Sequence, residues 1–513
     1  MTSIINNKII IYIAPFFLGL LTSFSLPPYN LILINFFTFP LLILFLIYNY
    51  KNKWNSFKIG WLFGFGYFIS NIYWITNSLK FDEIFRFLIP IAFIIIPLFL
   101  GIFYGLATFV CSFFKLKKNF YTIFIFALVF SILEFIRGFI FGGFPWNLIV
   151  YSWTNYLHSL QILSLIGTYS FNLISLTFFL IPTVITFKKS RKFKFITFIF
   201  LIFILISNYF YGYQNIKNDE KLYTQLEDLK IKIISPKISI KRFFEANNEI
   251  KIIEELIELS DPNSNSKTIF IFPEGALAGV TLEKLKTFKK LFSEKFSDQH
   301  KIIIGINIEK EINNNKKIYN SMVVLDNNLN LVSEYNKIKL VPFGEFLPFE
   351  KLFKKFGLKK VSYGYESFSA GKERNLISFD DTNFSFIPLI CYEIIYSGKI
   401  NLNGQNTNFI INISEDGWFG NSVGPHQHFS HTIFRSIEEG KNVIRSTNNG
   451  ISAYIDKNGF IVSKLESTTK GVIEINKYKK FKETFFSKFG NNIFFYIIIL
   501  YCILILVLKR RES

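Results

Sequence analysis

Repeated apolar segments of bilayer length constrain the fold of this chain more than any other feature. An α-helix needs about 20 apolar residues to cross the hydrocarbon core of a membrane. Half of the 513 residues are hydrophobic and 65 are Phe, which is typical of a membrane protein that also carries a folded domain. No small-residue cleavage site follows the first segment, so it is predicted to remain as a span. Eight spans are predicted, at residues 8–25, 31–49, 59–77, 87–114, 121–142, 164–187, 194–212 and 491–508.

Basic residues between the spans predict how the chain is oriented. Clusters of Lys and Arg follow the second, fourth and sixth predicted spans, and Lys509, Arg510 and Arg511 lie near the end of the chain. Basic loops favour the cytoplasm, so both termini are predicted inside and the segment after the seventh span outside. The net charge of +20 suits anionic lipid head groups. No nucleic-acid module is recognised, so no nucleic-acid partner is expected.

The long polar segment between the seventh and eighth spans is predicted to fold as an external α/β domain. It alternates short β-rich runs with helical patterns, as layered α/β folds do. We therefore expect three parts: a seven-helix bundle at 1–212, the external domain at 213–488, and a final span with a basic tail at 489–513. Strands are expected at 230–235, 268–272, 301–308, 321–325, 384–390, 409–413, 451–456 and 460–464, and helices at 245–259 and 282–296.

Cys391 is the single cysteine of this external segment, because Cys111 and Cys502 fall within predicted spans. It ends an apolar run that a helix-like segment follows, which predicts a strand-to-helix turn. A thiol at a helix N-terminus is favoured as a thiolate. A buried structural cysteine explains the stretch equally well when it is taken alone. An unpaired thiol in an exported, oxidising compartment favours a reactive cysteine.

Two charged residues lie at or beside other apolar strands of the same segment. The run 269–275 carries Glu274, and the run 335–345 carries Lys337. A carboxylate, an ammonium group and the thiol of Cys391 could serve as base, oxyanion stabiliser and nucleophile. A surface ion pair is the alternative for the two charged residues. Three such residues at strand ends together favour catalysis.

Short motifs surround these three residues, and one further motif follows the fifth span. They are Phe-Pro-Glu at 272–274, Lys-x-x-Leu-Val-Pro-Phe-Gly-Glu at 337–345, Cys-Tyr-Glu at 391–393, Asp-Gly-Trp-Phe-Gly from 416, Arg-Ser-Thr-Asn-Asn-Gly from 445, and Gly-Phe-Pro-Trp at 143–146.

In this order, Glu274, Lys337 and Cys391 resemble the Glu-Lys-Cys triad of the nitrilase, or carbon-nitrogen hydrolase, superfamily. With the eight spans and the other motifs, nearly the whole chain resembles the bacterial apolipoprotein N-acyltransferase family. The resemblance implies an αββα sandwich on the periplasmic side of the bacterial inner membrane, in a protein expected to be a monomer. It implies no cofactor and no metal.

The resemblance also implies a two-step acyl transfer. Cys391 would take an acyl chain from a phospholipid as a thioester, and the amine of a diacylglyceryl apolipoprotein would then accept it. Glu274 would act as the base. Lys337 would stabilise the oxyanion together with the backbone N–H of Tyr392. Apolar walls would exclude water from the thioester.

Other residues near the triad have less definite roles. Glu345 resembles the second acidic residue of the family, and we expect it to orient Lys337 or Glu274. Tyr392 and Glu393 flank the nucleophile, where packing for the tyrosine and a cap or ion pair for the glutamate are alternatives to catalysis. Candidate substrate contacts are Trp146, Phe243, Phe346 and Trp418.

The run 343–360 mixes apolar and basic residues. We expect an amphipathic arm on the outer membrane surface that admits lipid and covers the site. A helix packed on its own domain is the alternative. Two stretches depart from the family pattern. Glu415 stands where Asn is expected, and the loop 235–243 lacks the usual Gln-Gly-Asn and has Phe243 where Trp is common.

His426, His428 and His431 form a pattern that could suggest zinc, but no fourth ligand or second shell is recognised nearby, so no metal is expected. Two other functions fit parts of the sequence. A membrane-anchored amidase would use the same triad and release its thioester to water. A transporter or scaffold would use charges within the spans, of which Glu134 and Arg137 are candidates; they could equally anchor helix packing.

Overall fold

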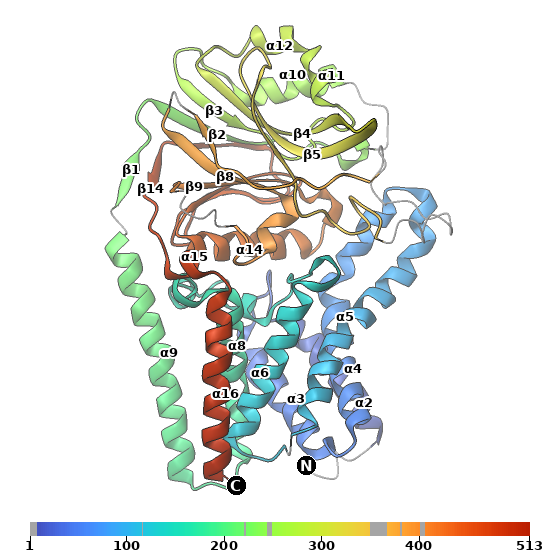
Figure 1. Ribbon diagram of the computed structural model, residues 1–513, viewed down its shortest axis with the longest axis vertical. Helices are drawn as coiled ribbons and strands as arrows, with labels where there is room; N and C mark the ends of the chain where they lie inside the picture. Colours follow the sequence, from blue (N-terminus) through green and yellow to red (C-terminus); the bar gives the residue numbers. More distant parts are fainter. Residues whose placement is uncertain are drawn as a thin grey trace.

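The structure is a computed structural model that describes residues 8–114, 116–219, 222–243, 249–348, 367–379, 382–400 and 406–512. A bundle of long helices forms one end of the molecule, and two stacked sheets with flanking helices form the other (Figure 1). Helices α14 (Gly424–Glu439) and α15 (Phe485–Phe489) lie between the sheets and the bundle. The helical bundle and the α/β part that the sequence predicted are therefore both present.

Each of the eight predicted spans contains a helix, and six helical segments of the described chain are long and apolar enough to cross a bilayer. The other two are α2, which is short, and α4, whose apolar run is interrupted by polar residues and glycine. The eight helices are α2 (Lys8–Ser23), α3 (Asn35–Asn49), α4 (Lys53–Ile72), α5 (Ile89–Cys111), α6 (Phe120–Arg137), α8 (Leu163–Leu180), α9 (Arg191–Asp219) and α16 (Asn492–Glu512).

Glycine lets α4 pack closely between two neighbours. A Cβ added at Gly66 would lie 2.0 Å from the carbonyl oxygen of Phe16 in α2, and one added at Gly60 would lie 2.1 Å from Thr108 Oγ1 in α5. Small residues permit such backbone approach in membrane helices. Packing against other helices thus compensates for the weak apolar character of α4. Helix α9, in contrast, has an exposed apolar stretch and continues to Asp219, beyond the predicted end of its span at 212.

Glu134 and Arg137 of α6 lie 3.8 Å apart and are fully buried. Glu134 accepts hydrogen bonds from Tyr104 of α5, at 2.9 Å, and from Asn172 of α8. Arg137 donates to the carbonyl of Phe144 in the loop that follows α6. These contacts join three helices and a loop, so they favour the packing interpretation of the two charges.

Two six-stranded sheets and the helices that cover them form an αββα sandwich. One sheet has the order β12-β11-β10-β9-β8-β7, and the other has the order β13-β2-β3-β4-β5-β6. Helices α10 (Glu249–Ser260), α11 (Leu282–Lys286) and α12 (Lys289–Ser293) lie over the second sheet, and α14 (Gly424–Glu439) lies under the first (Figure 1). The strands are β2 (Leu229–Ser235), β3 (Lys267–Ile271), β4 (His300–Ile312), β5 (Asn315–Leu325), β6 (Leu331–Asn336), β7 (Ile377–Phe379), β8 (Phe384–Ile390), β9 (Phe409–Glu415), β10 (Asn442–Asn448), β11 (Ser452–Ile455), β12 (Ile461–Leu465) and β13 (Gly471–Ile475), with a separate ribbon of β1 (Tyr223–Gln225) and β14 (Lys477–Lys479).

Side-chain alternation explains the layering. Ile231 and Ile233 of β2 belong to the core between the sheets, whereas Ile234 packs with Ile253 and Leu256 of α10. Successive residues of a strand face opposite sides, and a sheet covered on both faces reads as a nearly continuous apolar run. This is why β3 and β8 could be predicted from their sequences.

Two predicted helices differ from the observed ones. The expected helix at 282–296 is two short helices, α11 and α12, separated at Thr287 and Phe288. The expected helix at 245–259 is observed as α10 from Glu249, and residues 244–248 lie outside the described part of the chain. Strand β10 was not predicted because its residues are mostly polar, although all of them are buried.

Candidate active site

Cys391 lies directly after β8, at the first residue of the 3₁₀ helix Cys391–Ile395. Its φ of +49° is in the left-handed region, which is costly for a residue with a Cβ and is common at functional sites. The residue is 8% exposed. The predicted turn is therefore present, but a single 3₁₀ turn follows it in place of a longer helix.

Glu393 joins the backbone before this turn to the segment that follows β6. Its Oε2 accepts a 2.9 Å hydrogen bond from the N–H of Ile390, and its Oε1 accepts one of 3.0 Å from the N–H of Ile338. The hydroxyl of Tyr335 donates to the same Oε1 at 2.7 Å, and Arg374 pairs with it at 3.2 Å. This carboxylate is fully buried, and its partners fit the expected cap and ion-pair role.

Glu274 follows β3, where Gly275 turns the chain with a φ of +59°. Oε1 of Glu274 accepts a 2.7 Å hydrogen bond from Asn320 Nδ2. Oε2 accepts one of 2.9 Å from the backbone N–H of Glu415. Both carboxylate oxygens therefore have fixed donors, and the residue remains buried beside the cavity described below.

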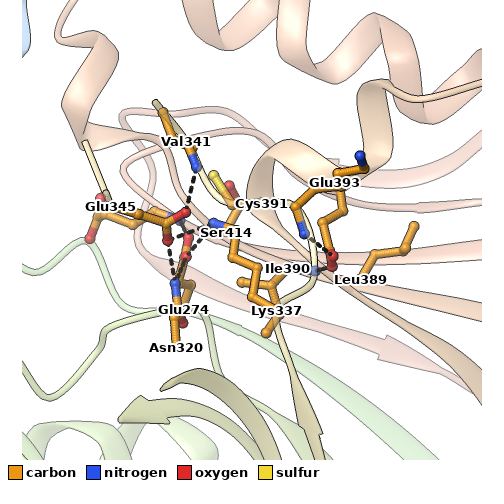
Figure 2. A network of polar contacts seen from close by, with 12 residues as sticks. Glu274, Asn320, Lys337, Val341, Glu345, Leu389, Ile390, Cys391, Glu393 and Ser414 are labelled. Atoms are coloured by element: carbon orange, nitrogen blue, oxygen red, sulfur yellow. Dashed lines mark hydrogen bonds and ion pairs between the residues drawn. The ribbon is translucent and has the colours of Figure 1, made fainter. Parts of the chain in front are cut away.

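Lys337 follows β6 and is 1% exposed. Its Nζ lies 2.9 Å from Glu345 Oε1 and 3.3 Å from Glu274 Oε1. Asn320 also donates to Glu345 Oε1, at 2.8 Å, and the N–H of Val341 donates to Glu345 Oε2 at 2.8 Å. Figure 2 shows this network. Glu345 contacts Lys337 directly and is joined to Glu274 through Asn320, as the expected orienting role requires.

Opposite charges keep Lys337 protonated. Burial by itself lowers the pKa of Lys337. The carboxylates of Glu274 and Glu345 together raise this pKa by more than burial lowers it, so the pKa lies well above its ordinary value. Each carboxylate is in turn beside a permanent positive charge. The site therefore contains a fixed ammonium group where an oxyanion could be stabilised.

The pKa of the Cys391 thiol is raised, whereas the sequence led us to expect a lowered pKa. Burial raises its pKa well above the ordinary value, and the charge of Glu274 raises it more than Lys337 lowers it. The expected stabilisation of a thiolate by a helix N-terminus is wrong for this state, because one 3₁₀ turn provides little dipole and desolvation disfavours the anion. A thiol protonated at neutral pH needs a base to react.

Buried polar residues lie beneath the nucleophile. Nε2 of His428 and Nδ2 of Asn412 lie 3.3 Å and 3.4 Å from the carbonyl oxygen of Cys391. Nδ1 of His428 lies 3.0 Å from Asp416 Oδ1, and Arg445 pairs with Asp416 at 2.9 Å. His428 thus takes part in a hydrogen-bond network of protein side chains and backbone. Within the described residues, no group of three or more His, Cys, Asp and Glu could hold a metal ion.

One cavity of about 1400 Å³ adjoins the triad. All four candidate substrate contacts line it, as do Glu345 and Tyr392, whereas Glu393 is not among its lining residues. Helix α5 contributes Ile91, Ile95 and Phe99, which are 47%, 57% and 43% exposed. Exposed apolar side chains of a helix in the bundle therefore form part of the cavity wall. Its lining includes Trp74, Phe141, Trp146, Phe243, Glu274, Lys337, Phe346, Cys391, Trp418 and Phe419.

Trp146 has a packed position in the wall of this cavity. Its ring lies 5.1 Å from His428 and 4.9 Å from Trp74, and its Nε1 donates a 2.9 Å hydrogen bond to Gln427. It is 2% exposed. A tryptophan near the end of a span usually lies at the membrane–water interface as an anchor. Trp146 instead lies buried within the protein. Phe346 is described, but most of the predicted arm at 343–360 lies outside the described part of the chain.

Sequence reasoning missed Asn320, the amide that bridges Glu274 and Glu345. The predicted strand 321–325 started one residue too late to include it, whereas β5 extends from Asn315 to Leu325. Ser414, whose hydroxyl donates a 2.7 Å hydrogen bond to Asp416 Oδ1 and which lowers the pKa of the Cys391 thiol against the effect of burial, was also missed. A polar residue within an apolar strand was the available signal in both cases.

A helical bundle of membrane-spanning length, joined to an αββα sandwich with Glu, Lys and Cys around one cavity, defines a membrane protein of the carbon-nitrogen hydrolase class. Residues 245–476 match the family model described as carbon-nitrogen hydrolase, and residues 18–181 match the one described as the apolipoprotein N-acyltransferase N-terminal domain. The apolipoprotein N-acyltransferase of Rickettsia prowazekii is 31% identical over 459 residues, with 89% of this chain and 90% of that protein covered. The chain belongs to the apolipoprotein N-acyltransferase family.

Other relatives agree with this assignment. The apolipoprotein N-acyltransferases of Brucella melitensis and Rhodopseudomonas palustris are 29% and 28% identical over 479 and 509 residues. These alignments cover 90% and 96% of this chain, and 88% and 94% of the relatives. Among solved structures, an amidase of the nitrilase superfamily from Nesterenkonia is 11% identical with a TM-score of 0.35, over 50% of this chain and 92% of that one, a likeness too distant to support the assignment.

Proposed function

We propose that this protein transfers an acyl chain from a phospholipid to the N-terminal amine of a diacylglyceryl apolipoprotein, through a thioester on Cys391. One observation carries the proposal: Glu274, Lys337 and Cys391 line a single cavity whose wall includes exposed apolar side chains of the bundle helix α5. A lipid acyl chain can enter such a cavity from the bilayer. The names of the relatives support the same reaction.

In the first step, Glu274 removes the thiol proton and the sulfur of Cys391 attacks the carbonyl carbon of the phospholipid ester. The carbon–sulfur bond forms and the carbonyl oxygen becomes an oxyanion. When the intermediate collapses, the ester carbon–oxygen bond breaks. The lysophospholipid oxygen takes the proton from Glu274, so atoms and charge balance. The raised pKa of the Cys391 thiol is the reason that this step needs a base.

Lys337 stabilises the oxyanion in this proposal. Its positive charge is maintained by two carboxylates, and its Nζ is held by Glu345 at 2.9 Å. The backbone N–H of Tyr392 supplies a second donor at the start of the 3₁₀ helix. Donors that are fixed before the reaction need not reorganise when the negative charge develops.

In the second step, the amine of the diacylglyceryl peptide attacks the thioester carbonyl and gives its proton to Glu274. The carbon–sulfur bond breaks, the amide forms, and Cys391 takes the proton back. The apolar cavity wall keeps water from the thioester. This wall favours acyl transfer over an amidase, for which release to water is the productive step.

The charge pattern supports a bacterial inner-membrane location with residues 213–488 on the periplasmic side and the basic connections in the cytoplasm. Residues 1–212 and 489–513 then form the membrane part. We also propose that the protein works as a monomer, because the described residues of one chain supply the whole triad network.

The test uses full-length protein in detergent with phospholipid vesicles and intact-mass spectrometry. Wild type should gain the mass of one acyl chain, Cys391→Ala should not, and a diacylglyceryl peptide added afterwards should remove the adduct and become acylated. If wild type never gains the adduct, or Cys391→Ala gains it equally, the proposal is wrong. If the adduct is lost only to water, the protein is a hydrolase.

A further inference from the structure

A buried ion pair joins the loop after β2 to the end of β9. Arg242 Nη2 pairs with Glu415 Oε2, and the two side chains are 2% and 1% exposed. These charges lie in the two stretches that depart from the family pattern, the loop at 235–243 and the residue at 415. A buried charge is stable when a partner compensates it, so the two departures depend on each other.

Arg242 also binds the backbone that follows Glu274. Its Nε and Nη2 donate hydrogen bonds of 3.1 Å and 2.7 Å to the carbonyl of Gly275. Its Nη1 donates to the carbonyls of Ile238 and Ser239 at 3.2 Å and 2.9 Å. The guanidinium group therefore links the loop that carries it to the turn after the catalytic carboxylate.

Glu415 binds Glu274 from the other side. Its backbone N–H donates the 2.9 Å hydrogen bond to Glu274 Oε2. Its side chain fixes the direction of that N–H, because Oε1 accepts a 2.8 Å hydrogen bond from the N–H of Gly417 and Oε2 accepts one of 2.7 Å from Asn448. The side chain thus holds the turn from which the donor to Glu274 projects.

We propose that Arg242 and Glu415 are positioning residues for Glu274, an inference that rests on the proposed function because Glu274 is the base there. Arg242 acts through the carbonyl of Gly275, and Glu415 acts through its own backbone N–H. Their opposite charges also balance beside the carboxylate. Neither residue exchanges a proton with substrate.

The balance of charge gives the inference a signed consequence. Within the described segments, the other charged or titratable groups that face Glu274 are Lys337, Cys391 and, through Asn320, Glu345. With these unchanged, Glu415→Gln leaves the charge of Arg242 uncompensated. An uncompensated positive charge stabilises nearby negative charge, so the acid limb of the acylation rate should move to lower pH.

The experiment measures the burst of nitrophenolate from p-nitrophenyl octanoate, with full-length protein in detergent, over a range of pH. The ester carbon bonds to Cys391 and nitrophenolate leaves, so the burst reports the acylation step without phospholipid. Glu415→Gln should lower the burst rate about tenfold, with a larger change in the maximal burst rate constant than in the substrate concentration that gives half of it. Its acid limb should lie below that of wild type.

The double variant Arg242→Gln with Glu415→Gln removes both charges. We expect its acid limb to return to the wild-type position while its burst rate stays low, because Arg242→Gln removes the hydrogen bonds to the carbonyl of Gly275. This variant leaves no unpaired buried charge, so it tests the inference even if Glu415→Gln does not fold. As a matched control, Lys230→Gln with Glu474→Gln removes an exposed pair at 3.5 Å and should not change the burst.

Two results would overturn the inference: a folded double variant with the wild-type burst rate, or a Glu415→Gln variant whose rate falls without any movement of the acid limb. The second result would indicate a merely structural pair. Failure of the proposed function looks different. It is seen in wild type itself, as an absent burst or as no transfer to the diacylglyceryl peptide.

Discussion

The hydroxyl of Tyr392 donates a 2.6 Å hydrogen bond to the carbonyl of Gly143. Tyr392 directly follows Cys391, and Gly143 lies in the loop after α6, where its φ is +79°. The residue beside the nucleophile is therefore tied to the helical bundle. The position of Cys391 depends on both parts of the molecule.

Tyr392→Phe should remove this tie and little else. We expect the acylation of Cys391 by phosphatidylethanolamine vesicles to slow about tenfold, while the free energy of unfolding falls by about 1 kcal/mol. A time course of intact mass measures the first quantity. Tyr396→Phe is the matched control. Its hydroxyl lies 2.9 Å and 3.1 Å from the carbonyl oxygens of Gly142 and Gly143, so it contacts the same loop, but Tyr396 lies beyond the 3₁₀ helix and its effect on Cys391 should be smaller. Equal effects would show that the tie has no particular link to Cys391.

Lys337→Met and Glu274→Gln should move the pKa of Cys391 in opposite directions. The charge of Lys337 lowers this pKa and that of Glu274 raises it. A higher pKa leaves less thiolate at a given pH. The pH midpoint for alkylation of Cys391 by iodoacetamide should therefore rise in Lys337→Met and fall in Glu274→Gln. Peptide mass spectrometry separates Cys391 from the other two cysteines. Shifts in the same direction would contradict the electrostatic account of the site.

Gly275→Ala should displace Glu274. Its φ of +59° disfavours a Cβ, and that Cβ would lie 2.9 Å from Cζ of Phe243. We expect a loss of about 1–3 kcal/mol in unfolding free energy and of about a hundredfold in acylation rate. Gly279→Ala separates the two causes, because its φ is +71° and no atom lies within 4 Å of the added Cβ. It should cost similar stability and little activity. Loss of activity in both variants would mean that the Phe243 contact is irrelevant.

Arg445→Met should destabilise the fold strongly. Arg445 and Asp416 are fully buried, and an unpaired buried charge costs about 3–5 kcal/mol. The unfolding midpoint in detergent measures the loss. Arg445→Lys keeps the charge and should cost less. If Arg445→Met unfolds like wild type, the pair contributes nothing to stability.

The same pair predicts how stability varies with pH. Burial alone would raise the pKa of Asp416, but Arg445 and the hydrogen bonds from His428 and Ser414 bring it well below its ordinary value. A carboxyl group with a lowered folded pKa stabilises the fold above its unfolded pKa, and this stability is lost as pH falls toward the folded pKa. The temperature of half-unfolding should therefore decrease as the pH is lowered beneath about 4. Asp416→Asn should reduce the dependence of stability on pH in this range. If the variant shows the same pH dependence as wild type, the lowered pKa of Asp416 does not explain it.

Much of the fold could be predicted from the sequence, for a local reason. Apolar runs mark two kinds of segment. Some are strands buried between protein layers, such as β3 and β8, and others are helices long and apolar enough to cross a bilayer, such as α5 and α16. Strand β10 could not be found in this way because its buried residues are polar. Their partners, such as the carbonyls of Ile234 and Ile271 bonded by Ser446, belong to the other sheet.

Residue order was enough to predict that Glu274, Lys337 and Cys391 stand at strand ends, because a reactive residue after an apolar run is visible locally. The surroundings of these residues became known from the folded structure. Asn320 joins two carboxylates, Arg242 meets Glu415 from a segment far away in the chain, and the buried thiol is protonated. Electrostatic and hydrogen-bond energies depend on distances of a few ångströms and on desolvation, which packing of the two sheets sets and residue order does not.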